Sequence, residues 1–209
     1  KDGTAVGDLK FKDLNGDGIV NGDDQTVIGY ALPNFTYGLN TNLSYKNFEL
    51  SIFAQGVYGN DIANMARQTV LHNFTMSTNV STDMLRYYGR ELDNGQIITD
   101  TDIPRMIFPR DVNDNKRNSD YFLEDGSYLR IKSINLSYNI PENIYKIMGL
   151  NKFQVYFTIE NLYTFTNYSG YNPEIGNSSA FRANPLAFGI DNAVYPMPRT
   201  FLFGINIGL

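Results

Sequence analysis

One short stretch holds most of the closely spaced oxygen-bearing side chains that could bind a metal ion. DLNGDGIVNGDD, residues 13–24, has the spacing of a twelve-residue calcium loop, with glycine at position 6 to permit a sharp turn. The ligands assigned by this spacing are Asp13, Asn15, Asp17, Ile19 through its carbonyl, Asn21 and Asp24. The sequence therefore predicts a structural Ca²⁺ site that stiffens a loop.

The flanks of this loop differ from those of a calcium sensor. DLKFKD, residues 8–13, alternates like a strand, so no entering helix precedes the loop. DDQTVIG, residues 23–29, could form one short exit helix with Asp23 near its start. The loop thus resembles half of an EF-hand, closer to a dockerin repeat, with Asp24 shorter than the usual glutamate. The alternative is a solvated cluster of Asx turns without metal.

Residues for acid–base or nucleophilic catalysis are scarce. His72 is the single histidine and cysteine is absent, so no Ser-His-Asp or thiolate arrangement can be assembled. Arg130 and Lys132 stand at a strand end with Asp125 nearby, and we interpret them as charges facing a wet interior or pairing with loops. We expect no enzyme activity from this chain.

A second group of candidates is aromatic. NYSGYNPEIGNSSAFRANP, residues 167–185, sets aromatic side chains among small polar ones. The weak candidates for substrate binding are Tyr168, Tyr171 and Phe181. Such residues can stack on sugar rings, or they can pack the loops together, and the sequence leaves both open.

These candidates must be positioned by strands, because alternation with a period of two dominates the chain. Phe201, Phe203 and Ile205 share one side of RTFLFGINIGL, and small polar residues occupy most of the other side. The predicted strands are about 35–45, 48–58, 128–138, 152–163 and 199–209. One helix is expected in NDIANMARQTVL, residues 60–71, with Asn60 or Asp61 as its N-cap, either as packing or as a docking element.

Two all-β architectures fit these strands. A soluble sandwich would bury the apolar sides, but globular strands average about 5–6 residues. Runs of about eleven residues with aromatic ends favour tilted membrane strands of roughly 9–11 residues. The net charge of −5 makes nucleic acid an unfavourable partner, and no apolar run is long enough for a membrane helix.

The connections between these strands alternate in length. The connections after 45 and after 138 are short to moderate, whereas 59–127 and 164–198 are long. Outer-membrane barrels have short periplasmic turns and long external loops, so residues 1–34, 59–127 and 164–198 are expected outside. Because five strands cannot close a barrel, further strands must complete it.

Five segments in order resemble the C-terminal part of SusC/RagA-type TonB-dependent outer-membrane transporters. They are GDLKFKDLNGDGIVNGDD, FTYGLNTNLSYKNFELSIFAQGVYGNDI, FLEDGSYLRIKSINLSYNIP, ENLYTFTNYSGYNPEI and YPMPRTFLFGINIGL. The resemblance implies the last five antiparallel strands of a 22-stranded transmembrane β-barrel, with long extracellular loops that contain short helices. One departure is the terminal Leu209, where such barrels typically end in an aromatic residue.

The resemblance also implies a function and partners. It implies active import of oligosaccharides or peptides across the outer membrane of a Gram-negative bacterium. A SusD-like surface lipoprotein would cap the barrel. TonB would act through an N-terminal part that lies outside this chain, and outer-membrane lipid would surround the strands. The alternative is a soluble or surface-attached, calcium-stabilised β-sandwich that binds glycans. The residues do not distinguish glycan from peptide cargo.

Overall fold

The computed structural model describes residues 4–72, 79–106, 113–175 and 188–209. Contacts divide the chain into two compact units. The loop unit comprises Lys1–Gly29 and Ala63–Leu123, and the sheet unit comprises Tyr30–Ile62 and Glu124–Leu209. None of the helices in the described part of the chain combines the length and hydropathy needed to span a membrane.

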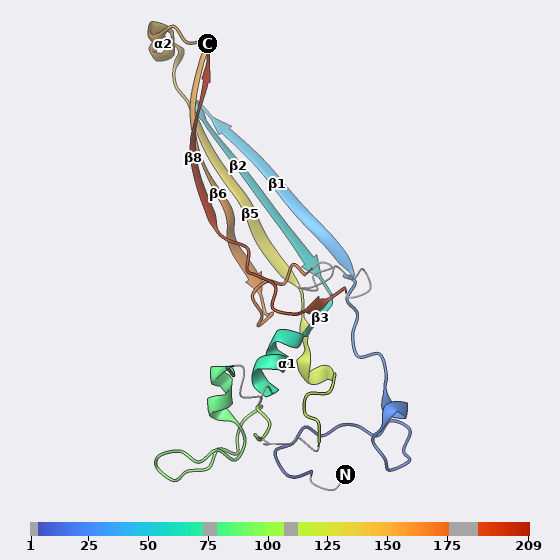
Figure 1. Ribbon diagram of the computed structural model, residues 1–209. Coiled ribbons are helices and arrows are strands. Elements are labelled where there is room, and N and C mark those ends of the chain that lie inside the picture. Colours follow the sequence, from blue (N-terminus) through green and yellow to red (C-terminus); the bar gives the residue numbers. More distant parts are fainter. Residues whose placement is uncertain (1–3, 73–78, 107–112, 176–187) are drawn as a thin grey trace. The chain divides into compact units, whose positions relative to one another are not determined.

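Five long strands form the sheet unit, as the alternating pattern predicts (Figure 1). They are β1 (Phe35–Tyr45), β2 (Phe48–Tyr58), β5 (Tyr128–Asn139), β6 (Lys152–Thr166) and β8 (Thr200–Gly208). Every neighbouring pair is antiparallel, and the order is β1-β2-β5-β6-β8. β1 and β2 have the predicted bounds, whereas β6 continues past 163 to Thr166.

The strand register gathers the apolar residues on one face of the sheet. Residues directly opposite each other in antiparallel strands share a face, so each row can be followed across all five strands. One row consists of Leu43, Leu50, Leu136, Phe157 and Phe203. We call this side the apolar face. Its other large members include Leu39, Ile52, Ile134, Ile159, Phe201, Ile205 and Ile207.

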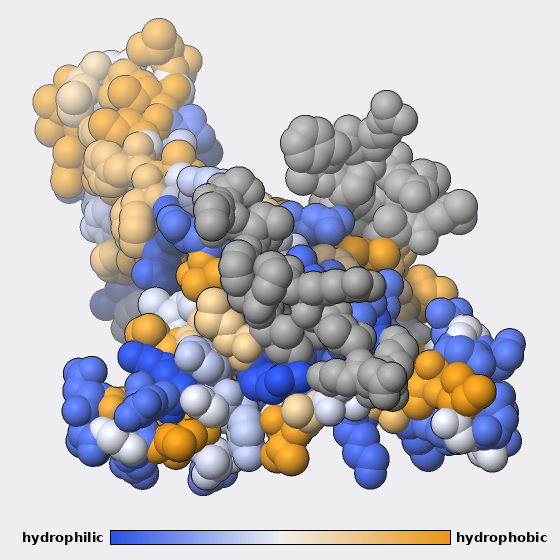
Figure 2. All heavy atoms as spheres, turned by 60° about the horizontal axis from the view of Figure 1, so that its bottom comes forward, coloured by the Kyte–Doolittle hydropathy of each residue, from blue (hydrophilic) through white to orange (hydrophobic). Residues whose placement is uncertain are grey.

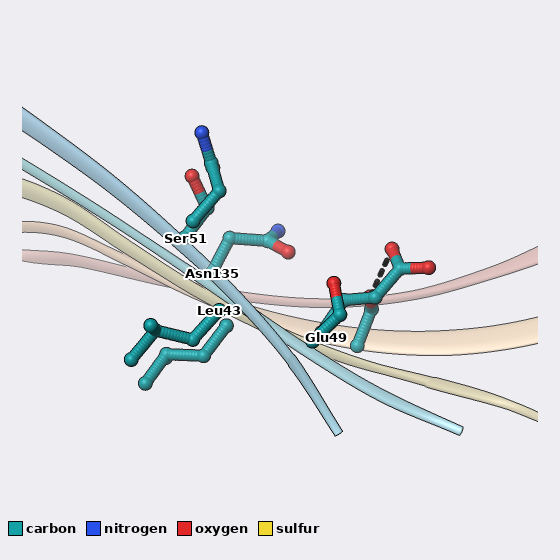
Figure 3. Close-up of a pocket in the computed structure, with 8 residues that line it drawn as sticks. Leu43, Glu49, Ser51 and Asn135 are labelled. Carbon is teal, nitrogen blue, oxygen red and sulfur yellow. Dashed lines mark hydrogen bonds between the residues drawn. The ribbon is translucent and has the colours of Figure 1, made fainter. Parts of the chain in front are cut away.

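The opposite side carries mainly small and polar residues, with Phe53 and Tyr156 as large exceptions, and we call it the polar face. The row next to Leu43 runs through Asn42, Ser51, Asn135 and Thr158, and it ends at Leu202 in β8. Asn135 donates from Nδ2 to Thr158 Oγ1 at 2.6 Å. Figure 3 shows the two sides directly: Ser51 and Asn135 point away from the side on which Leu43 lies.

A β-bulge in β5 changes which residues face which side. Ala54 lies opposite Ile131 and Phe53 lies opposite Ser133, so Lys132 is an extra residue in β5. The bulge shifts the alternation, and Tyr128 therefore lies with Arg130 on the polar face. The two tyrosines at the ends of β5 therefore lie on different faces, Tyr138 on the apolar face and Tyr128 on the polar face.

The apolar face is exposed rather than covered by a second sheet. Leu39 is 65% exposed and Phe203 is 73% exposed, although both stand in regular strands. The buried cluster of the sheet unit consists instead of Ile62, Tyr168 and Ile175. A sandwich would require burial of this face, which the described residues of the sheet unit do not provide.

Short elements complete the chain. β3 (Asp61–Asn64), β4 (Leu123–Asp125) and β7 (Ile190–Asp191) form a small sheet in the order β4-β3-β7. α2 (Glu142–Tyr145) and the 3-10 helix η4 (Lys146–Met148) lie in the connection between β5 and β6. The remaining 3-10 helices are η1 (Gly22–Asp24), η2 (Thr82–Arg86) and η3 (Asp120–Phe122).

α1 (Met65–His72) is the helix expected near residue 60, but it begins later. The prediction that Asn60 or Asp61 caps it is wrong, because Asp61 begins the extended strand β3. Asn64 accepts a hydrogen bond from the Arg67 N–H at 2.8 Å, as an N-cap side chain does. Leu71 of α1 is buried with Met84 and Ile103 in the core of the loop unit.

Candidate functional site

The polar face carries a network of hydrogen-bonded side chains at one end of the sheet. Glu49 accepts hydrogen bonds from Asn139 at 2.9 Å and from Ser137 at 3.5 Å, and Gln154 donates to Ser137 at 3.3 Å. Figure 3 shows Glu49 beside the pocket that Ser51 and Asn135 also line. The polar face thus offers hydrogen-bond donors and acceptors to a polar solute or to water.

A charged cluster occupies the polar face beyond the bulge. Arg130 is 3% exposed, and its guanidinium donates to a Glu174 carboxylate oxygen at 2.7 Å. Lys132 donates to both oxygens of the same carboxylate, at 2.8 and 3.1 Å. Arg130 and Lys132 are two residues apart in β5, so both side chains can reach Glu174 from the same side of the strand. We call Arg130, Lys132 and Glu174 the charged cluster.

Further polar groups satisfy the buried guanidinium. Arg130 donates from Nε to Thr164 at 2.7 Å and from a terminal nitrogen to Asn172 at 2.7 Å. Asn172 also accepts the Glu174 N–H at 3.1 Å, which forms a tight turn around Pro173. Because a buried charge is costly unless it is paired and hydrogen-bonded, this arrangement fixes the chain after β6 against the sheet wall.

The partner of Arg130 differs from the one that sequence proximity indicates. Asp125 accepts a hydrogen bond from the Ser127 N–H, whereas Glu174 makes the ion pairs with Arg130 and Lys132. Glu174 is distant in sequence, so no local pattern indicates the pairing. The period-2 pattern does break at Lys132, with apolar residues at 129, 131, 134 and 136, and this break signals the bulge.

The three aromatic candidates have different positions. Tyr168 is 5% exposed, and its hydroxyl donates to Asp191 at 2.6 Å. Burial together with the Asp191 hydrogen bond raises the pKa of Tyr168 above its ordinary value. Tyr171 is 72% exposed and presents its ring to solvent, while Phe181 lies outside the described residues. Tyr168 thus stabilises its own loop. Of the two candidates within the described residues, Tyr171 is the one whose ring is exposed enough to stack on a ligand.

The candidate calcium loop is ordered by side-chain-to-backbone hydrogen bonds. Asp13 accepts from the Gly16 N–H at 2.6 Å and from the Gly18 N–H at 2.8 Å. Gly18 has φ 83°, a conformation that favours glycine, so the turn needs its position-6 residue. Asn15 accepts from the Asp17 N–H at 2.9 Å, and Asp17 accepts from the Ile19 N–H at 2.7 Å. The side chains at positions 1, 3 and 5 of the loop therefore each accept a hydrogen bond from a backbone N–H that follows them, which holds the backbone in a tight turn.

The end of this loop is closed by Asp24. Its carboxylate accepts from the Leu14 N–H at 2.7 Å and from the Asn21 N–H at 2.8 Å. The hydrogen bonds from the Asn21 and Leu14 backbone lower the pKa of Asp24. A carboxylate at position 12 thereby joins the two ends of the loop. The exit helix expected over 23–29 is only the single 3-10 turn η1, and Gln25 is already extended.

The donor set of this loop mixes acidic and neutral oxygens. No group of three or more His, Cys, Asp or Glu side chains in the described ranges is arranged to hold a metal ion. Asn15, Asn21 and the Ile19 carbonyl are neutral oxygen donors of the kind that Ca²⁺ accepts beside carboxylates. The residue types of this loop are therefore chemically suited to a hard cation such as Ca²⁺. His72 ends α1, and its side chain lies outside the described residues.

Sequence comparison relates the chain to large receptors. No protein-family model matches it. It is 35% identical over 199 residues to TonB-dependent receptor P3 of Formosa agariphila, covering 94% of this chain and 18% of that receptor. It is 26% identical over 200 residues to the TonB-dependent receptor SusC of Bacteroides thetaiotaomicron, covering 94% and 17%. The chain thus spans less than a fifth of these two relatives.

Structural comparison gives the same fold. The RagAB peptide transporter matches 91% of this chain with a TM-score of 0.69 and 22% identity, over 19% of that chain. The RagAB peptide importer in its closed-closed state matches 92% with a TM-score of 0.66 and 21% identity. The chain belongs to the family of TonB-dependent receptors that includes SusC, and it matches one segment of these receptors.

Proposed function

We propose that this chain forms the C-terminal five strands of a 22-stranded outer-membrane barrel that imports oligosaccharides or peptides by TonB-dependent transport. The observation that carries this proposal is the two-faced sheet. Large apolar residues form one exposed face across all five strands, and the other face is predominantly polar. A barrel wall in a Gram-negative outer membrane needs both faces, one toward lipid and one toward water.

The distribution of aromatic rings on the apolar face supports membrane insertion. Tyr45, Phe48 and Tyr138 lie opposite one another near one end, with the Phe48 and Tyr138 ring centroids 4.6 Å apart. Phe35 stacks on Tyr58 at 5.2 Å near the other end. Aliphatic side chains and the row that contains Phe157 and Phe203 fill the distance between them. Aromatic girdles at both interfaces are typical of outer-membrane barrels.

The edges of the sheet support a larger barrel. β1 and β8 are the first and last strands of the five-stranded order, so each has one unpaired edge in this sheet. An unpaired backbone group in hydrocarbon costs several kcal/mol, and closed barrels avoid that cost. Additional strands must therefore pair with β1 and β8 in the membrane.

The proposed transport involves no bond breaking by this chain. The polar face would line the passage, and the charged cluster would hold the chain after β6 against that wall. TonB and a SusD-like surface lipoprotein are the proposed partners, supported by the similarity to SusC and to the RagAB complex. Oligosaccharides and peptides are both proposed as cargo. RagAB is named as a peptide transporter.

Calcium is proposed as a structural ion of the loop unit. Asp13, Asn15, Asp17 and Asn21 would hold it with Asp24 and the Ile19 carbonyl, in the loop already ordered by backbone hydrogen bonds. Outside the cell a weak site suffices, because extracellular modules bind Ca²⁺ with dissociation constants on the order of 10⁻⁴–10⁻³ M. The ion would stiffen an external loop.

Cysteine labelling tests the proposed orientation. Leu39→Cys on the apolar face and Asn40→Cys on the polar face can be compared in the full-length receptor in outer membranes, with the receptor that lacks both substitutions as the background control; this chain itself contains no cysteine. A sulfonated, membrane-impermeant maleimide should label Asn40→Cys and leave Leu39→Cys unlabelled until detergent is added. Equal labelling of both positions before detergent would contradict the membrane barrel and favour a soluble domain.

A further inference from the structure

The connection between β5 and β6 exposes apolar side chains at the end of the sheet. Ile144 is 48% exposed, Met148 is 61% exposed and Ile147 is 87% exposed, although these residues lie in the ordered helical turns α2 and η4. Polar residues would serve a connection that faced only water. Three adjacent apolar side chains instead form a small hydrophobic surface that needs an explanation.

The two sides of this turn differ sharply in polarity. Successive helical residues are rotated by about 100°, so Ile144, Ile147 and Met148 fall on one side. Glu142 and Lys146 fall on the opposite side, where the Lys146 ammonium donates to the Glu142 carboxylate. The turn is therefore amphipathic, and its charged side carries no net charge.

Local hydrogen bonds hold the turn in place. Gly149 has φ 73° and donates to the Lys146 carbonyl at 3.0 Å, while Leu150 donates to the Tyr145 carbonyl at 3.1 Å, which closes the helix end. Ile140 donates to the Phe153 carbonyl at 2.9 Å, so β5–β6 pairing continues up to the turn. The apolar side chains are thus fixed relative to the strands.

The turn lies at the end of the sheet where the apolar face carries an aromatic row. Tyr45, Phe48 and Tyr138 form that row, and Tyr138 precedes the first residue of α2 by four residues. Figure 1 shows α2 and the C-terminus at the same end of the strands. In Figure 2 hydrophobic residues gather over the distant upper-left part of the surface, where this end of the sheet unit lies.

We infer that the α2–η4 turn is a membrane-surface anchor that lies in the boundary between headgroups and acyl chains at the periplasmic end of the strands. This inference rests on the proposed membrane orientation. Ile144, Ile147 and Met148 enter the lipid, and the Glu142–Lys146 pair faces water. Since the pair carries no net charge, the anchor binds through apolar contact and requires no anionic lipid.

Site-specific fluorescence in the full-length receptor, reconstituted in lipid nanodiscs, tests this anchor. An environment-sensitive NBD probe is attached to Ile147→Cys, to the opposite-face control Glu142→Cys, and to Leu39→Cys in β1. Nitroxide-labelled lipids should quench the probe at 147 roughly twofold or more beyond that at 142, because interfacial helices bury their apolar side by about 5–10 Å. The difference should be the same in zwitterionic and anionic lipid.

The control position separates two failures. If lipid quenches the probe at 39 but leaves 147 and 142 equal, the anchor is overturned and the barrel stands. If the probe at 147 is shielded from water without lipid quenching, a protein surface covers the turn and the lipid assignment is wrong. If lipid quenches none of the three probes, the proposed membrane orientation fails as well.

Discussion

The sheet unit exposes large apolar side chains along one whole face of its strands, whereas the loop unit has a small buried core among scattered exposed apolar residues. Phe203 is 73% exposed in β8, while Leu71, Met84 and Ile103 are buried together in the loop unit. Burying apolar surface away from water stabilises a fold by about 25 cal/mol per Å². The exposed apolar face of the sheet is therefore unfavourable in water, whereas the buried core of the loop unit is favourable. The sheet is suited to a hydrocarbon surrounding, and the loops are suited to water.

The two units also satisfy their polar groups in different ways. The strands pair backbone with backbone along the whole sheet. The loop unit relies on side chains: Asp8 accepts two hydrogen bonds from Arg105, at 2.7 and 2.9 Å. Burial raises the pKa of Asp8, but the Arg105 hydrogen bond and those from Ala5 and Asn115 outweigh it, so the pKa is lowered. Side-chain chemistry thus substitutes for a large core in the loops.

The largest expected effect comes from a charge on the apolar face. Leu39→Arg should destabilise the receptor in lipid by about 2–4 kcal/mol, since residue 39 lies near the middle of β1 and arginine near the bilayer midplane must leave water. Asn40→Arg, the neighbouring position on the polar face, is the control and should change stability much less. Urea-induced unfolding in lipid vesicles measures both. Equal losses would remove the contrast between the two faces.

The next effect concerns the polar face. Glu174→Ala should cost about 1.5–3 kcal/mol of local stability, because Arg130 loses a charged hydrogen-bond partner while it stays buried. Hydrogen exchange at the Ile175 amide should accelerate accordingly. Glu160→Ala is the control: it removes a carboxylate that lies within β6, and the exchange rate of the Ile175 amide should stay unchanged. Unaltered exchange in Glu174→Ala would show that the charged cluster does not hold this segment.

A smaller effect should appear at the buried tyrosine. Tyr168→Phe removes the donor to Asp191 and should cost about 1–3 kcal/mol locally. The pKa of Tyr168 is raised in the fold, so its contribution is fully present below the ordinary value of 10.0 and is lost as pH rises through the folded pKa.

Iodoacetamide labelling of Ile175→Cys, in the cluster that contains Tyr168, follows this loss. Labelling should speed up at strongly alkaline pH when Tyr168 is present. In the Tyr168→Phe background the rate should be raised already at neutral pH, with less further dependence on alkali. A pH profile that is the same in both backgrounds would assign the alkaline opening to other groups.

The smallest effect is expected from calcium in the loop unit. About 5 mM Ca²⁺ should stabilise the folded loop by about 1–2 kcal/mol for a site of the expected extracellular affinity. Hydrogen exchange of residues 13–24 with and without Ca²⁺ measures it, and Asp13→Ala should abolish the response. Asp23→Ala, at a position without an assigned ligand, is the control. A calcium response that survives Asp13→Ala would exclude this loop as the site.

Much of the sheet is predictable because alternate residues of a strand face opposite sides of the sheet, and each side selects a different polarity. In β1 and β2 the period-2 pattern predicts the bounds of both strands. It also predicts that their large apolar residues lie mainly on one side. The helix start was not predictable in this way. Asn60, Asp61 and Asn64 are all acceptable N-caps by type, and pairing in β3 decides that Asn64 caps the helix.

The sequence by itself determined the five strands, most of the division into two faces, and the spacing of the oxygen-bearing residues in 13–24, because these depend on neighbours along the chain. Tertiary structure alone decided that Glu174 pairs with Arg130 and Lys132, and that Tyr168 is buried against Asp191 rather than exposed like Tyr171. These contacts join residues far apart in sequence. Their energies depend on burial and distance, which no local pattern encodes.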